Sequence, residues 1–529
     1  MPEAKSSSAF RGWLPWILLG ALLVVTLAVR WRLRDFPLER DEGEYAYNAQ
    51  RILEGEPPYS SAYASQKYPA TYYYSAAAMG IWPQLPAGLR LGLAVANAGS
   101  IVLLFLLMRR LSGNLAAIIA AASYALLSVT AGVLGFAAHA THFVVLPMLG
   151  GLLLLIQAIE RERAFVRLAS AGALFGLAVL ARQPAIFFAA FGGVVLLVVD
   201  CRARRQWLAR AACFGFGAAA PLLLLFGYLW IAGVFPRFWF WTFTYAAEYG
   251  SQTTVAGGMA ELSSVFPRVL RGNTPIWLLA LAGLAVLFWK RDWRTAFFAG
   301  WLVAAAMAVT AGFYFREHYF VQLLPVVAGL AGLAAAGPPL AQRNTIRWQR
   351  IAAVAAPALL AFCTWRQADY LFSTPPVELC RRIYGSNLFP EAEIVARELR
   401  ARARPGDKLA VLGSEAEIYA LAGLRSATGY LYTYALMEES PFAELFQKEM
   451  MAEIEAARPR FLVLVDSPLS WLIRPRSPTV MLDWIGPFLN NNYRPIGFVE
   501  LGGRSVWDIA APAALPPDSH LAVFERQMD

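Results

Sequence analysis

The sequence predicts a mainly α-helical, polytopic membrane protein, with a transmembrane helical bundle of about eleven spans and a small extracytoplasmic α/β domain at its C-terminal end. Of the 529 residues, 58% are hydrophobic and only 16% are charged, whereas a soluble chain is typically about half apolar and a quarter charged. Apolar runs near the length of roughly 20 residues that a bilayer requires recur as far as residue 367. After about residue 370 the pattern changes to shorter alternating segments.

Each expected span is an apolar run bounded by charged or turn-forming residues. The runs lie near residues 13–33, 88–108, 114–132, 138–158, 165–181, 184–200, 208–232, 274–289, 295–314, 318–336 and 350–367. The division between the fifth and sixth runs rests on Arg182-Gln183-Pro184, which interrupts one long apolar stretch.

The arginines and lysines of the short loops predict the orientation of the chain. They occur before the first span and after every second span, at Lys5, Arg11, Arg109, Arg110, Arg161, Arg163, Arg167, Arg202, Arg204, Arg205, Arg210, Lys290, Arg291, Arg294, Arg343, Arg347 and Arg350. All of them lie on the inner side if the N-terminus is cytoplasmic. The loops 34–87 and 233–273 and the C-terminal region then lie outside. This distribution also explains the net charge of +10 without a nucleic-acid partner.

We therefore divide the chain into a transmembrane domain, residues 1–367, and an extracytoplasmic domain, residues 368–529.

In the second domain, helical patterns at 390–403 and 439–457 alternate with strand-like runs at 408–414, at 461–466 and from 495. Such alternation is typical of an α/β domain. The turn at Gly413-Ser414 has no glycine-rich dinucleotide fingerprint, and the spacing of the four cysteines matches no zinc or redox motif.

The first outer loop holds the densest group of polar and aromatic residues in the first half of the chain. Asp41, Glu42 and Glu44 lie within four residues, and a helix is expected from Glu44 to Leu53. Lys67 then precedes a Tyr-Pro pair and three consecutive tyrosines. An acidic pair, a short helix and a lysine just outside a bilayer indicate an active site at the membrane surface.

This loop resembles the first periplasmic loop of the GT-C membrane glycosyltransferases. It is most similar to the bacterial branch related to protein O-mannosyltransferases and to the aminoarabinose transferase of lipid A. The residues that carry the resemblance are Asp41-Glu42, Tyr45, Ala49, Ile52-Leu53, Gly55, Lys67, Pro69 and Tyr72-Tyr73. A charged juxtamembrane loop with an interfacial tyrosine belt is the alternative interpretation.

The resemblance implies an enzyme of the bacterial inner membrane. It would move a hexose or pentose from a polyprenyl-phosphate donor to an extracytoplasmic acceptor, an envelope lipid, glycan or protein, with inversion in a single displacement. The C-terminal domain resembles appended outer domains of such enzymes, where it could recognise the acceptor. The sequence identifies no separate cofactor. A divalent metal stays an open alternative.

The resemblance also assigns roles within the first loop. Asp41 would be the base that takes the proton of the acceptor hydroxyl, and Glu42 would assist it, orient a group, bind a metal, or be only a solvated acid. Lys67 would contact the donor phosphate as a point charge, or snorkel to anionic headgroups. Tyr45 and Tyr72 are candidates for substrate contacts.

Three further segments carry ionisable residues near the outer surface. Arg182, in LARQPA, resembles the family's basic residue at the outer end of a span and would bind the donor phosphate, or merely lie between two spans. Arg316 and His318, in FREHYF, could meet the same phosphate, or Arg316 could pair with Glu317.

His139 and His142, in GFAAHATHF, stand where relatives often carry a second acid. They could act as a neutral partner of the acceptor, a proton relay, two ligands of one metal, or a polar pair without chemistry. The aromatic stretch 235–249 is expected to form an interfacial helix that lines a lipid-chain groove, binds sugar faces, or belongs to an aromatic belt.

Two other functions are compatible with a polytopic chain. A transporter or flippase of lipid-linked sugars typically has inverted repeats and charges at the bilayer midplane, whereas this sequence has no visible repeat and its charges gather at one face. A polymerase or ligase of surface polysaccharide also has a large outer loop, but such enzymes lack an Asp-Glu pair directly after the first span, as far as the resemblance goes.

Overall fold

The computed structural model describes residues 4–203, 206–338, 342–509 and 519–527. The chain divides into two compact units, each described by itself. Unit 1 comprises Met1–Arg34, Arg90–Gly227 and Gly250–Thr374, and unit 2 comprises Asp35–Leu89, Tyr228–Tyr249 and Pro375–Asp529.

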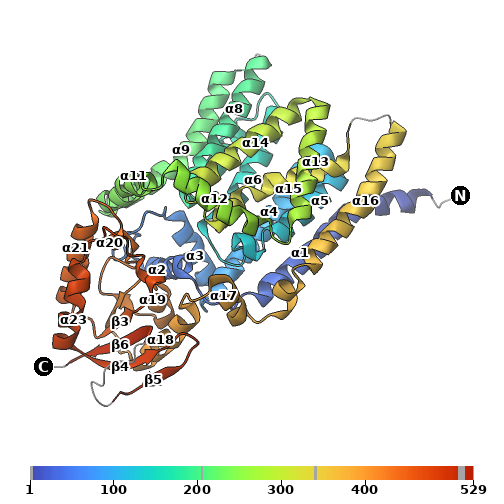
Figure 1. Cartoon of the computed structure of the whole chain (residues 1–529). Coiled ribbons are helices and arrows are strands. Elements are labelled where there is room, and N and C mark those ends of the chain that lie inside the picture. Colours follow the sequence, from blue (N-terminus) through green and yellow to red (C-terminus); the bar gives the residue numbers. More distant parts are fainter. Residues whose placement is uncertain (1–3, 204–205, 339–341, 510–518, 528–529) are drawn as a thin grey trace. The chain divides into compact units, whose positions relative to one another are not determined.

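Unit 1 is a bundle of helices (Figure 1). Its elements are α1 (Ala4–Arg32), α4 (Ala87–Ser112), α5 (Asn114–Leu127), η1 (Ala131–Val133), α6 (Ala140–Ile159), α7 (Phe165–Ala181), η2 (Gln183–Ala185), α8 (Ile186–Arg202), α9 (Trp207–Ile231), α12 (Val255–Leu270), α13 (Thr274–Lys290), α14 (Trp293–Thr310), η4 (Glu317–Gln322), α15 (Leu324–Ala336), α16 (Gln342–Trp365) and η5 (Asp369–Ser373).

Every predicted span coincides with one of these helices. Among the described residues, seven helices are long and apolar enough to cross a membrane, and α12 with α13 form a further pair bent by 102°. Three shorter apolar helices, α5, α7 and α15, fill the remaining predicted spans. The chain is thus a multi-pass membrane protein, and the count of eleven spans stays a prediction. The break at Arg182 is confirmed, because α7 ends at Ala181 and α8 begins at Ile186.

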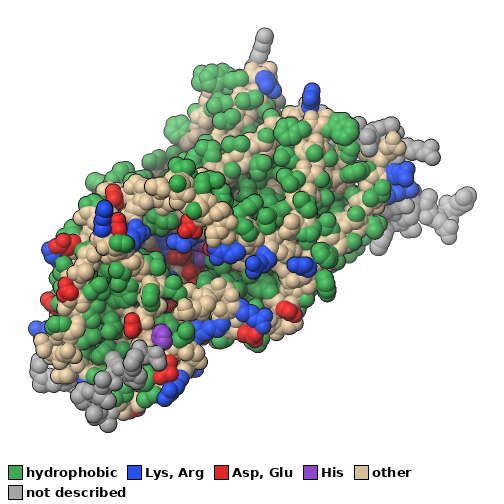
Figure 2. Space-filling model, in the orientation of Figure 1, with side chains coloured by type: hydrophobic (Ala, Val, Ile, Leu, Met, Phe, Trp, Pro, Cys, Tyr) green, Lys and Arg blue, Asp and Glu red, His purple; other side chains and the backbone are tan. Residues whose placement is uncertain are grey.

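The packing and the surface of unit 1 both suit a bilayer. Helices α7 and α9 approach so closely that a methyl group at Gly172 would overlap the carbonyl of Phe214, and small residues allow such approach between membrane helices. Large apolar side chains of α9, such as Phe216 and Leu224, are about three-quarters exposed. Hydrophobic side chains cover most of the visible surface around α8 and α14 (Figure 2). Lipid rather than water is the solvent for such a surface.

Unit 2 combines the first outer loop with the C-terminal region. Its elements are α2 (Arg40–Leu53), α3 (Ala70–Ile81), α10 (Phe235–Trp239), the π-helix η3 (Phe240–Tyr245), α11 (Ala246–Ser251), α17 (Pro376–Tyr384), α18 (Phe389–Arg402), β1 (Lys408–Leu412), α19 (Glu417–Ala422), β2 (Arg425–Ser426), α20 (Tyr434–Met437), α21 (Ala443–Ala457), β3 (Phe461–Val465), α22 (Pro468–Trp471), α23 (Val480–Asn492), β4 (Tyr493–Val499), β5 (Ser505–Trp507) and β6 (Leu521–Arg526).

The strands form one mixed sheet in the order β2-β1-β3-β6-β4-β5. Strands β2, β1 and β3 are parallel, whereas β6 runs antiparallel to both β3 and β4. Alternate side chains of β1, β3 and β6, including Leu412, Leu462 and Phe524, join a core with residues of α21 and α23. Figure 1 shows these two helices beside the sheet. The predicted α/β character is confirmed.

The predicted elements of the C-terminal region are all present with small shifts. The helix expected at 390–403 is α18, the one expected at 439–457 begins at Ala443, and the three expected strands are β1, β3 and β4. The sequence analysis did not identify β2, β5 or β6, of which the first two have only two and three residues.

The first loop differs from expectation at the start of its helix. Helix α2 begins at Arg40, four residues before the predicted start, because the Glu39 side chain accepts a hydrogen bond from the Glu42 backbone N–H at 3.0 Å and caps the helix. Asp41 and Glu42 therefore lie in the first helical turn. The sequence placed loop 34–87 with the transmembrane domain, whereas the contacts unite it with the C-terminal region, which begins at Pro375.

Candidate active site

The N-terminal part of α2 presents two carboxylates on one face. Asp41 and Glu44 are three residues apart, and residues with this spacing are neighbours on a helix surface. Glu42, one position after Asp41, points about 100° away around the helix and is fully buried. The carboxylate that accompanies Asp41 is therefore Glu44, although Glu42 was the acid predicted for the site.

Lys67 bridges these two carboxylates. Its Nζ lies 2.6 Å from Asp41 Oδ1 and 2.5 Å from Glu44 Oε2. The Glu44 side chain is 1% exposed, while the side chains of Asp41 and Lys67 are 29% and 22% exposed. Lys67 and Asp41 are thus accessible to a substrate. The buried Glu44 holds Lys67 in place through their ion pair.

The neighbouring carboxylates keep the side chain of Lys67 protonated. Burial lowers the pKa of the Lys67 ammonium, but the negative charges of Asp41 and Glu44 raise it more, so that its pKa lies well above the ordinary value for lysine. Lys67 is consequently a fixed cation at any physiological pH.

Tyrosines enclose this group of charges. Tyr72 of α3 donates a hydrogen bond from its hydroxyl to Glu44 Oε1 at 2.5 Å. The Lys67 ammonium lies 4.8 Å from the centre of the Tyr45 ring, within range of a cation–π interaction. Tyr59 donates to the Lys67 carbonyl at 2.5 Å. Of the predicted residues, Asp41, Lys67, Tyr45 and Tyr72 are brought together here.

Two residues of this site were not predicted. Glu44 was noticed only as one of three acids, although its three-residue spacing from Asp41 could have identified it. Tyr432, whose hydroxyl oxygen lies 3.4 Å from Lys67 Nζ, is 365 residues away in the sequence, and no local pattern indicated it.

The remaining predicted residues belong to unit 1. Arg182, at the end of α7, places its guanidinium carbon 3.7 Å from the centre of the Tyr319 ring and donates to the Ala308 carbonyl. Arg316 lies 6.0 Å from the centre of the Tyr314 ring. Glu317 forms its ion pair with Arg268 of α12, at 2.9 Å.

The histidines of unit 1 are arranged differently from the expected helical pair. His139 stacks on His318, with 3.9 Å between ring centres and an angle of 11° between the planes. His139 is the N-cap of α6 and has an extended backbone, so helical spacing does not govern its distance from His142, which is buried on α6. The stacked pair offers two nitrogen ligands to a metal, and a metal role stays a prediction.

Comparisons with known proteins identify one matching family model and several similar solved structures. Residues 66–230 match the family model of dolichyl-phosphate-mannose-protein mannosyltransferases. No curated protein sequence matches the chain. A similar solved structure is ArnT from Cupriavidus metallidurans bound to undecaprenyl phosphate, with a TM-score of 0.59 and 14% identity over 97% of this chain and 98% of that chain.

The oligosaccharyltransferase of Archaeoglobus fulgidus is similar over a smaller share of its own length. Its complex with an inhibitory peptide and a dolichol-phosphate has a TM-score of 0.50 and 13% identity, covering 97% of this chain and 76% of that chain. Its complex with Zn and sulfate has a TM-score of 0.52 and 14% identity, covering 93% and 72%.

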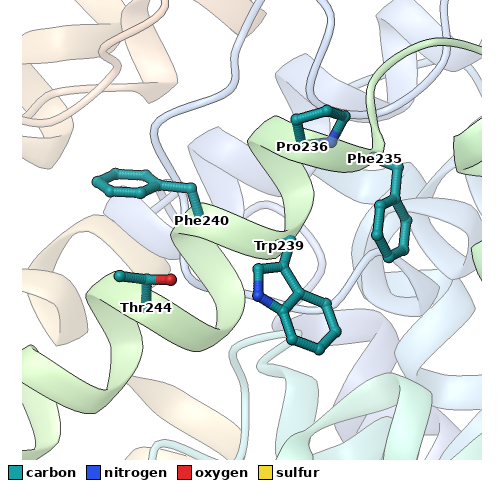
Figure 3. Close-up of a pocket in the computed structure, with 5 residues that line it drawn as sticks. All are labelled: Phe235, Pro236, Trp239, Phe240 and Thr244. Carbon is teal, nitrogen blue, oxygen red and sulfur yellow. The ribbon is translucent and has the colours of Figure 1, made fainter.

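The chain has the GT-C fold. In this fold the predicted aromatic segment 235–249 is helical, as expected, and consists of α10, the π-helix η3 and the start of α11. A surface pocket of unit 2 is lined by Phe235, Pro236, Trp239, Phe240 and Thr244 (Figure 3). Four of these five residues are apolar, so the lining suits a lipid chain or the bilayer interface better than a charged ligand.

Proposed function

We propose that the chain is a membrane glycosyltransferase that moves a hexose or pentose from a polyprenyl-phosphate donor to an extracytoplasmic acceptor by a single inverting displacement. The observation that carries this proposal is the lysine held between two carboxylates, because it places a fixed cation beside a partly exposed acid. Transfer from a lipid phosphate needs both groups: a cation for the leaving phosphate and a base for the acceptor hydroxyl.

Asp41 is the proposed base. The acceptor oxygen forms its bond to the anomeric carbon while Asp41 takes the hydroxyl proton. The bond between that carbon and the phosphate oxygen breaks, and the polyprenyl phosphate leaves with the electron pair. Lys67 stabilises the negative charge that develops on the leaving phosphate. Attack from the face opposite the phosphate inverts the anomeric centre.

The ion pair between Asp41 and Lys67 implies an order of binding. An ammonium 2.6 Å away holds the Asp41 carboxylate in an ion pair. A donor phosphate that accepts a hydrogen bond from Lys67 weakens this pair and leaves the Asp41 carboxylate available to the acceptor hydroxyl. Donor binding therefore prepares the base before the acceptor reacts.

The other predicted residues have supporting roles in this proposal. Tyr72 holds Glu44, and Tyr45 lies against the lysine; both would shape the sugar site. Arg182, Arg316 and His318 would add positive charge or donors for the phosphate. His139 and His142 would contact the acceptor as neutral groups, and Glu42 would support the first turn of α2.

The proposed location is the bacterial inner membrane, with a cytoplasmic N-terminus and an extracytoplasmic C-terminal domain that takes part in recognising the acceptor. The charge distribution of the short loops supports this orientation. The acceptor class is an envelope lipid, glycan or protein. ArnT in the similar structure is bound to undecaprenyl phosphate, which supports a polyprenyl-phosphate donor here.

The decisive experiment compares three isosteric variants in the same detergent preparation. Asp41→Asn retains the shape but cannot take a proton, and we expect transfer to slow by about 100-fold or more with donor binding intact. Glu44→Gln should mainly weaken the hold on Lys67, and Glu42→Gln should cost least. Near-parental turnover of Asp41→Asn together with an inactive Glu42→Gln would make Glu42 the base. Full activity of all three would remove the catalytic role of this loop.

A further inference from the structure

The C-terminal region supplies a hydroxyl group to the lysine of the site. Tyr432 lies between β2 and α20, with its hydroxyl oxygen 3.4 Å from Lys67 Nζ. The ammonium is also 5.1 Å from the centre of the Tyr432 ring. Both residues belong to unit 2. The lysine of the first loop is therefore contacted by a residue from the part of the chain to which only acceptor recognition was assigned.

The hydrogen bonds around Tyr432 define which way its proton points. Its hydroxyl donates to the Arg40 carbonyl at 2.7 Å, which leaves the oxygen lone pairs to accept from Lys67. An ammonium has three N–H donors, and those of Lys67 are directed at Asp41, Glu44 and Tyr432. Burial and the charges of Glu44 and Asp41 raise the pKa of Tyr432 well above its ordinary value, so this phenol keeps its proton.

Buried hydrogen bonds hold the segment that carries Tyr432. The backbone N–H of Thr433 donates to Ser414 Oγ at 3.1 Å, and the Thr433 hydroxyl donates to the Ser470 carbonyl at 3.1 Å. Next to Ser414, Glu415 accepts from Arg40 Nη2 at 2.9 Å. Arg40 is the first residue of α2. The start of α2 and the loop of Tyr432 are thus fixed to the same end of the sheet, where β1 ends.

We propose that Tyr432 is a positioning residue for Lys67 in the transfer reaction. The two carboxylates of α2 attract the ammonium at 2.6 and 2.5 Å, and the hydroxyl of Tyr432 is its third acceptor. Without this third acceptor the ammonium would settle deeper between Asp41 and Glu44, farther from a donor phosphate. The inference rests on the proposed function and gives the C-terminal region a part in donor binding.

The test compares Tyr432→Phe with a matched control, Tyr434→Phe. Both substitutions remove one hydroxyl and keep the ring. Tyr434 stacks near Tyr432, with 6.0 Å between ring centres, but its hydroxyl donates to the Leu469 carbonyl.

We measure the Kd for a polyprenyl monophosphate, the donor KM, the acceptor KM and kcat. For Tyr432→Phe we expect the Kd and the donor KM to rise about tenfold, the loss typical of one hydrogen bond to a charged group. The acceptor KM should stay unchanged, and Tyr434→Phe should match the parent.

A double-mutant cycle with Lys67→Met separates positioning from a merely structural role. If Tyr432 acts through Lys67, Tyr432→Phe should cause no further loss of donor binding when Lys67 is already replaced. An equal additional loss in that background would overturn the proposal, as would a parental donor KM in the single variant. A parent that neither binds the polyprenyl phosphate nor transfers sugar would instead refute the proposed function, and with it this inference. Parental transfer in Tyr432→Phe would refute the inference alone.

Discussion

At the scale of single residues, the stability of the site depends on the pairing of Lys67 with two carboxylates. Three partly or fully buried ionised groups share a small volume: one cation and two anions. Burying charges is costly unless they are paired, and removing one member leaves the others uncompensated. Replacing Lys67 would leave Asp41 and Glu44 facing each other with like charge. The lysine thus stabilises the N-terminal part of α2, in addition to the phosphate contact that we propose for it.

Substitution of Lys67 tests this double role. We expect Lys67→Ala to raise the donor KM much more than the acceptor KM, because the partner proposed for the ammonium is the donor phosphate. Lys67→Arg should retain part of the activity, since it preserves the charge but changes its geometry. Steady-state kinetics with each substrate varied in turn measures both effects. If Lys67→Ala keeps the donor KM and the turnover of the parent, the lysine only anchors the loop at lipid headgroups.

Among the secondary-structure elements, the contact between α2 and α19 positions the site. Gly43 of α2 lies against α19 so closely that a methyl group there would overlap the backbone of Glu417. Only glycine permits this approach of the two helices. Because Asp41 and Glu44 flank Gly43 on α2, the distance between these helices also sets where the two carboxylates lie relative to the sheet.

A Gly43→Ala substitution should therefore move α2 and disturb the site. Overlap with backbone cannot be relieved by a change of rotamer, and we expect a loss of stability of about 1–3 kcal/mol together with slower transfer. Gly80→Ala is the matched control, because a methyl group at this other helical glycine would meet only the Leu53 side chain at 3.6 Å. Thermal unfolding and turnover of both variants provide the measurement. Parental values for Gly43→Ala would show that α2 and α19 can separate without consequence.

For the whole molecule, the number of spans decides whether loop 34–87 and the region after residue 370 lie on the same side of the membrane. The apolar helices have unequal lengths: α9 has 25 residues, whereas α7 has only 17. A helix of 17 residues is about 25 Å long and stands at the lower limit for crossing a bilayer. Among the described residues, α5, α7 and α15 are the apolar helices of 17 residues or fewer that stand outside the bent pair, and whether each of them crosses the bilayer decides if the count is odd.

We predict that loop 34–87 and the region after residue 370 both lie outside the cytoplasm. Reporter proteins inserted at Gly55 and at Pro405 should both give an external signal, because all the basic short loops then face inward. A cytoplasmic signal at Pro405 alone would mean that the span count is wrong by one, most simply at the break between α7 and α8.

The sequence alone determined the membrane class, the positions of the predicted spans, the α/β character of the C-terminal region and the resemblance to GT-C enzymes, which the fold confirms. These features could be predicted because they depend on local composition and periodicity. The sequence also indicated Asp41, Lys67, Tyr45 and Tyr72, which lie in one loop. It did not identify α12, which lies within the predicted outer loop 233–273.

Only the tertiary structure decided that Glu44 rather than Glu42 accompanies Asp41, since the cap at Glu39 sets the register of α2. It alone joined His139 to His318 and Lys67 to Tyr432, because contacts between residues so distant in the chain arise from packing and leave no local pattern.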